Sequence, residues 1–193
     1  MRRLCVFCGS STGLDARYRE GAVTLGRLLV SRGLGLVFGG GSIGLMGVVA
    51  AAVLAVGGEA VGVIPHALAA RELAHRGVTD MRVVPSMHAR KALMAELSDG
   101  FVALPGGLGT FEELFEIATW GQLGIHGKPV GVLNLAGYYD PLVALLDHAV
   151  QEGFVSAANR RLILIEGDPA KLLDALAAQR PPAGPEWITP EET

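Results

Sequence analysis

Short apolar runs alternate with helical patterns along almost the whole chain. Seven of these runs indicate buried strands, at residues 4–8, 34–38, 60–64, 81–84, 100–104, 129–133 and 162–165. Helical patterns separate most of them, the clearest over residues 15–31 and 87–97. Strands that alternate with helices at this spacing form a parallel sheet that helices cover on both faces. The sequence therefore predicts an α/β protein with a doubly wound, mostly parallel sheet of about seven strands.

The length and charge of the chain suit one domain of this kind. Of the 193 residues, half are apolar and 18% are charged, which is enough to bury one substantial core. We expect a single Rossmann-like domain over residues 1–180 and a Pro-rich tail over residues 181–193. The net charge of −3 provides no basic stripe, so nucleic acid is not expected as a partner.

Two apolar segments indicate the cellular location of the protein. The run that follows Met1-Arg2-Arg3 is shorter than the apolar region of a signal peptide. Residues 43–58 are uncharged but rich in glycine, and they fall short of the about 20 residues that a membrane helix needs. We expect this second segment to form a helix buried in the core or against a second subunit. A cytoplasmic protein without membrane contact is predicted, in which Cys5 and Cys8 are small core residues.

Glycine accounts for 27 of the 193 residues, about twice its usual share of roughly 7%. No collagen-like period explains this excess. Instead, glycine-rich turns follow the first, second and fifth predicted strands, at residues 9–13, 39–47 and 105–109. Ligands of open parallel sheets bind beyond the carboxyl ends of the strands. The three turns meet at that edge, which predicts a nucleotide-like ligand.

The turn within residues 104–113 (LPGGLGTFEE) joins a strand to a helix. This geometry directs free backbone N–H groups and the positive end of a helix dipole at one point, where a phosphate is the natural occupant. The glycines let a ligand approach the backbone, and Glu112 and Glu113 would face whatever the phosphate carries. The same residues also fit a capping box, in which Thr110 caps the helix and Glu113 returns the hydrogen bond. These residues alone leave both interpretations open.

Two other patterns in the turn after the second strand are weaker. Residues 39–44 match the dinucleotide pattern GxGxxG, but Glu59 precedes the third strand, whereas a ribose-binding acid belongs at the far end of that strand. Residues 40–44 also match the GxSxG elbow of serine hydrolases. The partners available for that role, Asp140 and His148, fall in a helical pattern, so Ser42 is more simply interpreted as a helix N-cap.

Metal and Schiff-base chemistry have little support in the sequence. The five histidines show no metal-ligand spacing, and the Cys5-x-x-Cys8 pair has no second pair to complete a zinc site. Only three lysines exist, Lys91, Lys128 and Lys171, and none lies in a recognisable pyridoxal pattern. We therefore expect neither a metal nor a cofactor.

Residues 105–113 resemble the PGGxGTxxE signature of the LOG (Lonely Guy) family, the cytokinin riboside 5′-monophosphate phosphoribohydrolases. Further segments are similar to the same family: CGSS at residues 8–11, GGGSIGLMG at 39–47, MHARK at 87–91 and TWGQLGIH at 119–126. The resemblance extends from Cys5 to about Arg161. The departures are small, with Ala89 where a polar residue is common and Phe111 where Leu is common.

This resemblance implies an N-glycosidase that releases the free base and ribose 5-phosphate from cytokinin riboside 5′-monophosphates, and also from AMP. Such a reaction develops positive charge on the ribose. By its position in the motif, Glu113 is the carboxylate that stabilises this charge and activates water. Arg90 is the catalytic cation that balances charge on the departing base, although by itself it would fit a solvated charge on a helix.

The resemblance also implies which residues bind the substrate. The glycine turn at residues 105–110, called the phosphate turn below, is expected to hold the phosphate, with Gly40 and Gly41 on the other side of that phosphate. Residues elsewhere in the chain are expected to contact the rest of the nucleotide. The predicted set is Gly106, Gly107, Leu108, Gly109, Thr110, Glu112, Lys91, Glu72, Thr119, Gly40 and Gly41. A homodimer with its active sites near the subunit interface is the further expectation.

Two other functions remain open at the level of sequence. One is a nucleotide or molybdenum-cofactor carrier without catalysis on the same fold. The other is a broader purine nucleotide nucleosidase that prefers AMP. The presence of both Arg90 and Glu113 favours an enzyme, because a carrier has no use for an acid beside the sugar.

Overall fold

The structure, a computed structural model, describes residues 1–69 and 74–179. Within them, seven strands form one parallel sheet in the order β4-β3-β2-β1-β5-β6-β7. Each strand begins and ends within one residue of its predicted run, which confirms the predicted α/β fold. The strands are β1 (Arg3–Phe7), β2 (Gly35–Phe38), β3 (Ala60–Pro65), β4 (Asp80–Val84), β5 (Phe101–Ala103), β6 (Val130–Leu133) and β7 (Ile163–Glu166).

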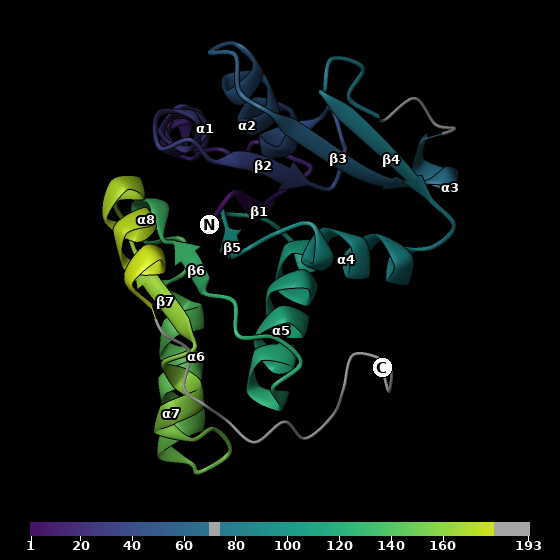
Figure 1. Cartoon of the computed structure of the whole chain (residues 1–193). Coiled ribbons are helices and arrows are strands. Elements are labelled where there is room, and N and C mark those ends of the chain that lie inside the picture. The colour runs from purple at the N-terminus through teal and green to yellow at the C-terminus, as the bar shows by residue number, and fades with distance from the viewer. Residues whose placement is uncertain (70–73, 180–193) are drawn as a thin grey trace.

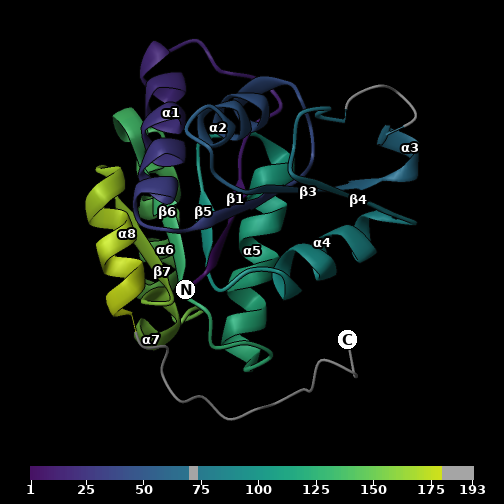
Figure 2. The same ribbon diagram turned by 45° about the horizontal axis from the view of Figure 1, so that its top comes forward.

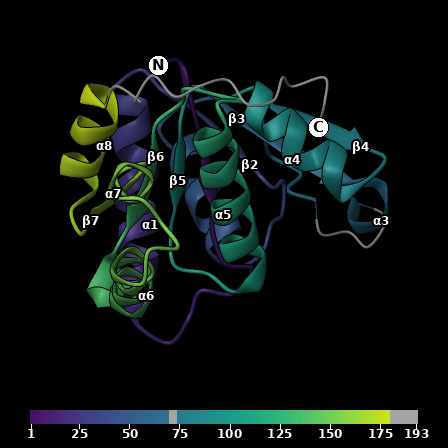
Figure 3. The ribbon, with the colours of Figure 1, turned by 90° about the horizontal axis from the view of Figure 1, so that it is seen from below.

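Helices cover both faces of this sheet (Figure 1). One face carries α1 (Ala16–Ser31), α2 (Gly44–Leu54) and α8 (Pro169–Ala178), and the other carries α4 (Met87–Glu96), α5 (Leu108–Leu123) and α6 (Asp140–Gln151). Figure 2 shows α1 and α2 side by side, and Figure 3 shows α4 and α5 from below. The short helices α3 (His66–Ala69), α7 (Ala157–Arg160) and η1 (Leu135–Gly137) lie in connections.

The two faces of the sheet have separate hydrophobic cores. Leu4 and Val6 of β1 pack toward α1, α2 and α8, whereas Cys5 and Phe7 pack toward α4, α5 and α6. Successive side chains of a strand point to opposite faces, so a strand covered on both sides reads as a continuous apolar run. Cys5 and Cys8 are buried free thiols, as predicted.

The apolar helix predicted within residues 43–58 is α2, and it packs against the sheet and against α1. Its residues Leu45, Val49 and Val53 are fully or almost fully buried. A Cβ atom added to Gly26 of α1 would lie 2.9 Å from the Cβ atom of Ala52, so the two helices are in close contact. Much of the apolar surface of α2 is therefore covered within the chain. None of the helices in the described ranges is long and apolar enough to cross a lipid bilayer.

The predicted N-cap at Ser42 is wrong, and the capping box that the sequence left open at Thr110 is not formed. Helix α2 has Ile43 as its N-cap, without a side-chain hydrogen bond, so Ser42 does not cap it. Helix α5 begins at Leu108 after Gly107, which places Thr110 inside the first turn and rules out the capping box. In both cases the helix starts one or more residues away from the predicted cap, because the glycine backbone turns directly into the helix.

The order of the strands fixes where a ligand can enter. From the central β1, the chain winds outward through β2, β3 and β4 on one side, and through β5, β6 and β7 on the other. The direction of winding reverses between β1 and β5, and such a switch point leaves a crevice beyond the carboxyl ends of the strands. The Gly9 amide, which follows β1, donates to the Pro105 carbonyl after β5 (3.0 Å). The predicted phosphate turn thus lies at this switch point.

Candidate active site

A cavity of about 410 Å³ opens at the carboxyl edge of the sheet. The ends of β1 and β3, the turn after β2, and the beginning of α5 form its walls. Arg90 of α4 and Glu113 of α5 line it together with residues 107–110. The structure therefore brings together the two predicted catalytic residues and most of the predicted phosphate turn.

The N-terminus of α5 presents unpaired amides to this cavity. No hydrogen bond in the described chain uses the N–H groups of residues 107–110, and the first bond at this end joins the Phe111 amide to the Gly107 carbonyl (3.1 Å). A Cβ atom added at Gly107 or Gly109 would have no neighbour within 4 Å. At Gly106 it would lie 2.1 Å from Thr110 Oγ1. Gly106 is therefore required for packing, whereas Gly107 and Gly109 leave space for an anion.

Arg90 and Glu113 form a buried pair beside these amides. The side chains of both are about 10% exposed, and Arg90 Nη2 lies 3.6 Å from Glu113 Oε1. The guanidinium is held by two carbonyls, because Nε donates to Val63 O (3.2 Å) and Nη2 donates to Gly39 O (3.3 Å). A Cβ atom at Gly39 would lie 1.8 Å from Arg90 Nη2, so a glycine is required there.

Burial gives Glu113 unusual acid–base behaviour. Loss of hydration raises the pKa of its carboxyl group to about 7, against the attraction of Arg90, and the neighbouring Glu112 and Glu116 raise it further. The attraction of Lys91 opposes these two carboxylates. A carboxyl group with a pKa near neutrality can accept and return a proton at physiological pH.

Lys91 lies beside this pair but does not line the cavity. Its ammonium group binds both Glu112 Oε1 and Glu116 Oε1, the latter at 2.9 Å, and its side chain is 9% exposed. The structure therefore places Lys91 and Glu112 in an ion-pair network between α4 and α5. Their predicted roles as nucleotide contacts receive no support from this geometry, because their charged groups are already paired with each other.

Three further predicted contacts lie elsewhere. Thr119 is exposed on α5, away from the cavity, and its hydroxyl donates to the Phe115 carbonyl (2.7 Å). Gly41 lines the cavity, but Gly40 does not, and its φ of 75° makes the left-handed turn that follows β2. Glu72 lies outside the described residues.

The cavity also has an apolar wall that no motif in the sequence indicated. Ile43 and Met46 of this wall follow β2, Ile64 lies at the end of β3, and Leu68 lies in α3 directly after β3. Their signal in the sequence was weak, because apolar residues near a buried strand usually belong to the core. Their position beyond the carboxyl ends of the strands could have identified them, since ligands bind at that edge.

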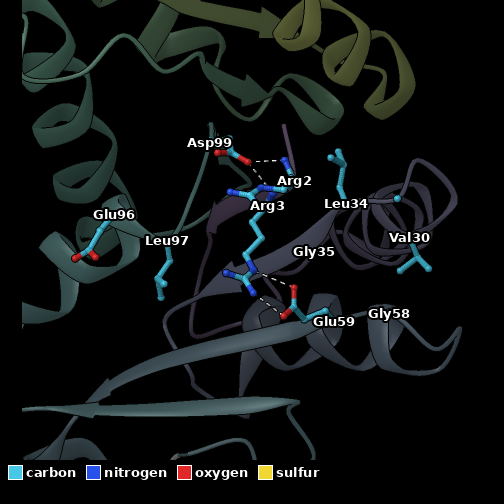
Figure 4. Close-up of a pocket in the computed structure, with 11 residues that line it drawn as sticks. Arg2, Arg3, Val30, Leu34, Gly35, Gly58, Glu59, Glu96, Leu97 and Asp99 are labelled. Atoms are coloured by element: carbon cyan, nitrogen blue, oxygen red, sulfur yellow. Dashed lines mark hydrogen bonds and ion pairs between the residues drawn. The ribbon is translucent and has the colours of Figure 1, made fainter.

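A second cavity, of about 620 Å³, lies at the opposite, amino edge of the sheet (Figure 4). Its charged groups largely bind one another. Arg3 forms two hydrogen bonds with Glu59, at 2.9 and 2.7 Å, and Asp99 accepts from the backbone amides of Arg2 and Arg3. This pairing indicates a structural role, so we place the candidate active site at the carboxyl edge.

The fold and the cavity define a Rossmann-like α/β protein with unpaired amides at a helix N-terminus and a buried acid at one site. A family model described as "possible lysine decarboxylase" matches residues 46–176. The chain is 55% identical to the probable cytokinin riboside 5′-monophosphate phosphoribohydrolase LOGL5 of Oryza sativa subsp. japonica, over 94% of this chain and 74% of that protein. It is 52% identical to the cytokinin riboside 5′-monophosphate phosphoribohydrolase LOG3 of Arabidopsis thaliana, over 93% and 84%.

These similarities identify the family that the motifs predicted. The chain belongs to the LOG family of cytokinin riboside 5′-monophosphate phosphoribohydrolases. Among solved structures, it resembles the molybdenum cofactor binding protein from Rippkaea orientalis, with a TM-score of 0.70 and 20% identity over 92% of this chain and 96% of that one. At this identity the likeness concerns the fold alone.

Proposed function

We propose that this protein hydrolyses the N-glycosidic bond of cytokinin riboside 5′-monophosphates, and of AMP, to release the free base and ribose 5-phosphate. One observation carries this proposal: the buried Arg90–Glu113 pair and the N-terminus of α5, with its unpaired amides, line the same cavity. A phosphate anchor and an acid at one site match what this substrate class requires. The names of the relatives support the same reaction.

The cavity suggests how such a nucleotide would lie. The 5′-phosphate would accept hydrogen bonds from the amides of residues 107–110, where the helix dipole also favours an anion. The ribose, which is bonded to this phosphate, would then lie next to Glu113. The base would extend toward the apolar wall of Ile43, Met46 and Ile64. That wall suits a purine with an apolar N6 substituent.

The proposed reaction uses Glu113 in its ionised form. As the bond from C1′ to the base breaks, its electron pair leaves with the base and positive charge develops on the ribose. The Glu113 carboxylate stabilises that charge and takes a proton from the water that adds to C1′. The departing base takes up one proton from the solvent, and Glu113 afterwards releases to the solvent the proton that it took from water, so the net reaction consumes one water molecule. No metal or cofactor is required for these steps.

Arg90 has an electrostatic role in this scheme. Its guanidinium supplies a positive charge. Because Val63 O and Gly39 O fix its position, it provides a preorganised positive charge within a largely buried site, where such charges stabilise developing negative charge most strongly. We propose that this charge acts on the leaving base and keeps part of the Glu113 population ionised at neutral pH.

Lysine decarboxylation by a pyridoxal Schiff base receives no support from the lysines. Lys91 is paired with Glu112 and Glu116, and Lys128 Nζ donates to the Ala95 carbonyl (2.7 Å). Lys171 lies on α8, on the other side of the sheet from Arg90 and Glu113. In the part of the chain that the structure describes, no lysine lines the cavity.

We also propose a homodimer that uses the surface of α4 and α5 next to the cavity. Leu108 of α5 is 86% exposed, and Met87 of α4 and Phe115 of α5 are also exposed although they are large and apolar. Exposed apolar surface around a site favours association with another protein. We place the protein in the cytoplasm, where the thiols of Cys5 and Cys8 stay reduced. Light scattering of the purified protein tests the dimer, and a monomer at micromolar concentration would contradict it.

The test of the proposed reaction is a product assay. The protein is incubated with AMP and with isopentenyladenosine 5′-monophosphate, and free base and ribose 5-phosphate are quantified by chromatography. We expect both products in equal amounts, with a loss of activity of at least about 10³-fold in Glu113→Gln. Calorimetry with the same nucleotides serves as the control. If the wild-type protein binds nucleotide but releases no base, the carrier function replaces the proposed one.

A further inference from the structure

Four aromatic rings lie in series next to the phosphate turn. Tyr18 of α1 contacts Tyr138, Tyr138 contacts Tyr139, and Tyr139 contacts Phe111 of α5, with centroid distances of 5.6, 4.9 and 6.3 Å. Each pair packs edge to face, the arrangement that aromatic rings favour. Phe111, which departs from the Leu common in the family signature, takes part in this series. The rings connect the helix layers on the two faces of the sheet at its carboxyl edge.

Hydrogen bonds link this series to the turn itself. The Tyr139 hydroxyl donates to the Leu104 carbonyl (2.6 Å), and the Tyr138 hydroxyl donates to the Gly106 carbonyl. The carbonyl between them, that of Pro105, accepts from the Gly9 amide (3.0 Å). Three consecutive carbonyls of the turn are thus held from outside it. Tyr139 is 1% exposed, and burial raises the pKa of its hydroxyl, so it stays a hydrogen-bond donor.

The bond from Tyr138 has a geometric consequence for the next amide. In a trans peptide, the C=O and the following N–H point in opposite directions, and no peptide of the described chain is cis. Holding the Gly106 carbonyl toward Tyr138 therefore turns the Gly107 N–H away from Tyr138. Gly107 lines the active-site cavity, and its N–H has no hydrogen-bond partner in the described chain.

The turn needs such a restraint because of its glycines. Glycine at 106 and 107 is free to adopt conformations closed to other residues, so this peptide unit can rotate at little cost. Gly106 cannot be replaced by a stiffer residue, since a Cβ atom there would collide with Thr110 Oγ1. A rotated peptide would present the Gly106 oxygen to the cavity and repel an anion. An external hydrogen bond is the available way to fix its orientation.

The segment that carries the two tyrosines is itself firmly held. Asn134 accepts from the Tyr139 amide and donates to Asp140 Oδ1, both at 2.7 Å. Ala136 has a φ of 53°, a left-handed conformation that costs a residue other than glycine roughly 1–2 kcal/mol. Such a conformation persists where the surrounding structure enforces it. The position of Tyr138 is therefore defined by its own turn as well as by the rings beside it.

We propose that Tyr138 is a positioning residue for substrate binding, which orients the Gly106–Gly107 peptide so that the Gly107 N–H donates to the 5′-phosphate. Tyr139 supports it by holding the Leu104 carbonyl two residues earlier. This inference rests on the proposed function, since it requires a phosphorylated substrate at the N-terminus of α5. It assigns a role to residues that lie outside the phosphate motif and about 30 residues away in the sequence.

The test compares Tyr138→Phe with Tyr18→Phe. Both changes keep the ring in the series, but only the first removes a hydroxyl that donates to the turn, because the Tyr18 hydroxyl has no hydrogen-bond partner in the described chain. We expect Tyr138→Phe to weaken binding of ribose 5-phosphate by about tenfold, the effect of one hydrogen bond to a charged group. Its affinity for adenine, which has no phosphate, should stay unchanged. Tyr18→Phe should alter neither.

A second measurement covers the case in which Tyr138→Phe is poorly folded. The amide resonance of Gly107 is followed by NMR while inorganic phosphate is added to the wild-type protein, and a specific, saturable shift is expected. Equal ribose 5-phosphate affinities in the wild type and a folded Tyr138→Phe variant would overturn this inference alone. So would a Gly107 resonance that does not respond while those of Leu108 and Gly109 do. Absence of any ribose 5-phosphate binding by the wild type would overturn the proposed function and this inference together.

Discussion

The two edges of the sheet each carry an arginine–glutamate pair, and the pairs behave in opposite ways. At the amino edge, Arg3 and Glu59 are both more than a third exposed and form two short hydrogen bonds. At the carboxyl edge, Arg90 and Glu113 are about 10% exposed and lie 3.6 Å apart, a distance too long for a good hydrogen bond. An arginine and a glutamate thus form hydrogen bonds with each other at the amino edge, whereas at the carboxyl edge they approach each other without a good hydrogen bond.

The acid–base consequences follow from this difference. The hydrogen bond from Arg3 holds the pKa of the Glu59 carboxyl below its ordinary value. Burial raises the pKa of the Glu113 carboxyl to about 7, because Arg90 offsets only part of the lost hydration. A well-paired, hydrated carboxylate stabilises the fold, whereas a buried and poorly paired one is available for chemistry. The comparison can be tested by making matched changes at both edges.

The largest contrast is expected when each arginine is replaced by lysine. Arg90→Lys cannot donate to Val63 O and Gly39 O at once while facing Glu113, because an ammonium group lacks the planar fork of a guanidinium. We expect kcat/KM with AMP to fall by about 10²–10³-fold. Arg3→Lys should change it less than about twofold, since a half-exposed pair contributes little. Steady-state kinetics of both variants measure the contrast, and similar losses at the two edges would refute it.

The next contrast concerns a glycine beside each pair. An added Cβ atom would lie 1.8 Å from Arg90 Nη2 at Gly39, and 2.7 Å from Glu59 Oε2 at Gly35. Arg90 is enclosed and must be displaced, whereas Glu59 is a flexible side chain that can move into solvent. We expect Gly39→Ala to reduce kcat by about tenfold or more, because catalytic groups displaced by about 1 Å lose much of their effect. Gly35→Ala should keep full activity, and full activity in Gly39→Ala would show that Arg90 is not required where it lies.

The pH dependence of stability should have opposite signs at the two edges. Glu113 has a raised pKa, so the stability that it contributes is complete below its ordinary pKa of 4.5 and is lost as the pH rises through about 7. Glu113→Gln should therefore increase the free energy of unfolding at pH 8 by up to about 3 kcal/mol, with little change near pH 5. Glu59 has a lowered pKa, so its contribution is present above its ordinary pKa and is lost as the pH falls.

Thermal unfolding of Glu113→Gln and Glu59→Gln between pH 5 and pH 8 measures these signs. We expect the Tm of Glu113→Gln to lie several degrees above that of the wild type at pH 8, because each kcal/mol of unfolding free energy raises the Tm of a chain of this size by about 2–4 °C. Glu59→Gln should melt slightly below the wild type at the same pH. A Glu113→Gln variant that melts below the wild type at pH 8 would mean that Glu113 stabilises the folded protein as an anion.

The smallest effect concerns the charges around Glu113. Lys91 opposes the rise of the Glu113 pKa, and Glu112 contributes to it. If Glu113 must be ionised to act, kcat/KM should rise with pH, with a midpoint at about pH 7. Because Lys91 lowers the pKa of Glu113, Lys91→Met should move the midpoint of this rising limb of the pH profile to higher pH. Glu112→Gln should move it to lower pH. A Lys91→Met variant that raises KM without moving the limb would instead support a direct nucleotide contact, as the family resemblance implied.

Much of the fold and part of the site could be predicted from the sequence. All seven strands follow from apolar runs, because strands covered on both faces leave a continuous local signal. The glycine turn after β5 was predicted for the same local reason, since a strand, a turn and a helix succeed one another within one motif. The family suggested by these motifs is confirmed by the relatives. The helix starts were less well predicted, as Ser42 and Thr110 show, because glycine turns leave several possible first residues.

Contacts between distant segments could not be predicted in this way. The family resemblance implied that Lys91 and Glu112 contact the substrate, yet in the structure they bind each other between α4 and α5. The hydrogen bond from Tyr138 to Gly106 joins the segments that follow the neighbouring strands β6 and β5, and it leaves no periodic signal in the chain.

The sequence by itself determined the order of the elements, the parallel sheet, the glycine turn at its carboxyl edge and the family. Only the tertiary structure decided that Arg90 meets Glu113 away from water, that Lys91 pairs with Glu112 and Glu116, and that the Tyr138 hydroxyl binds the Gly106 carbonyl. Backbone preferences and apolar periodicity act between residues close in sequence, so they can be recognised along the chain. Hydration and charge depend on which distant side chains pack together, and these set the pKa of Glu113.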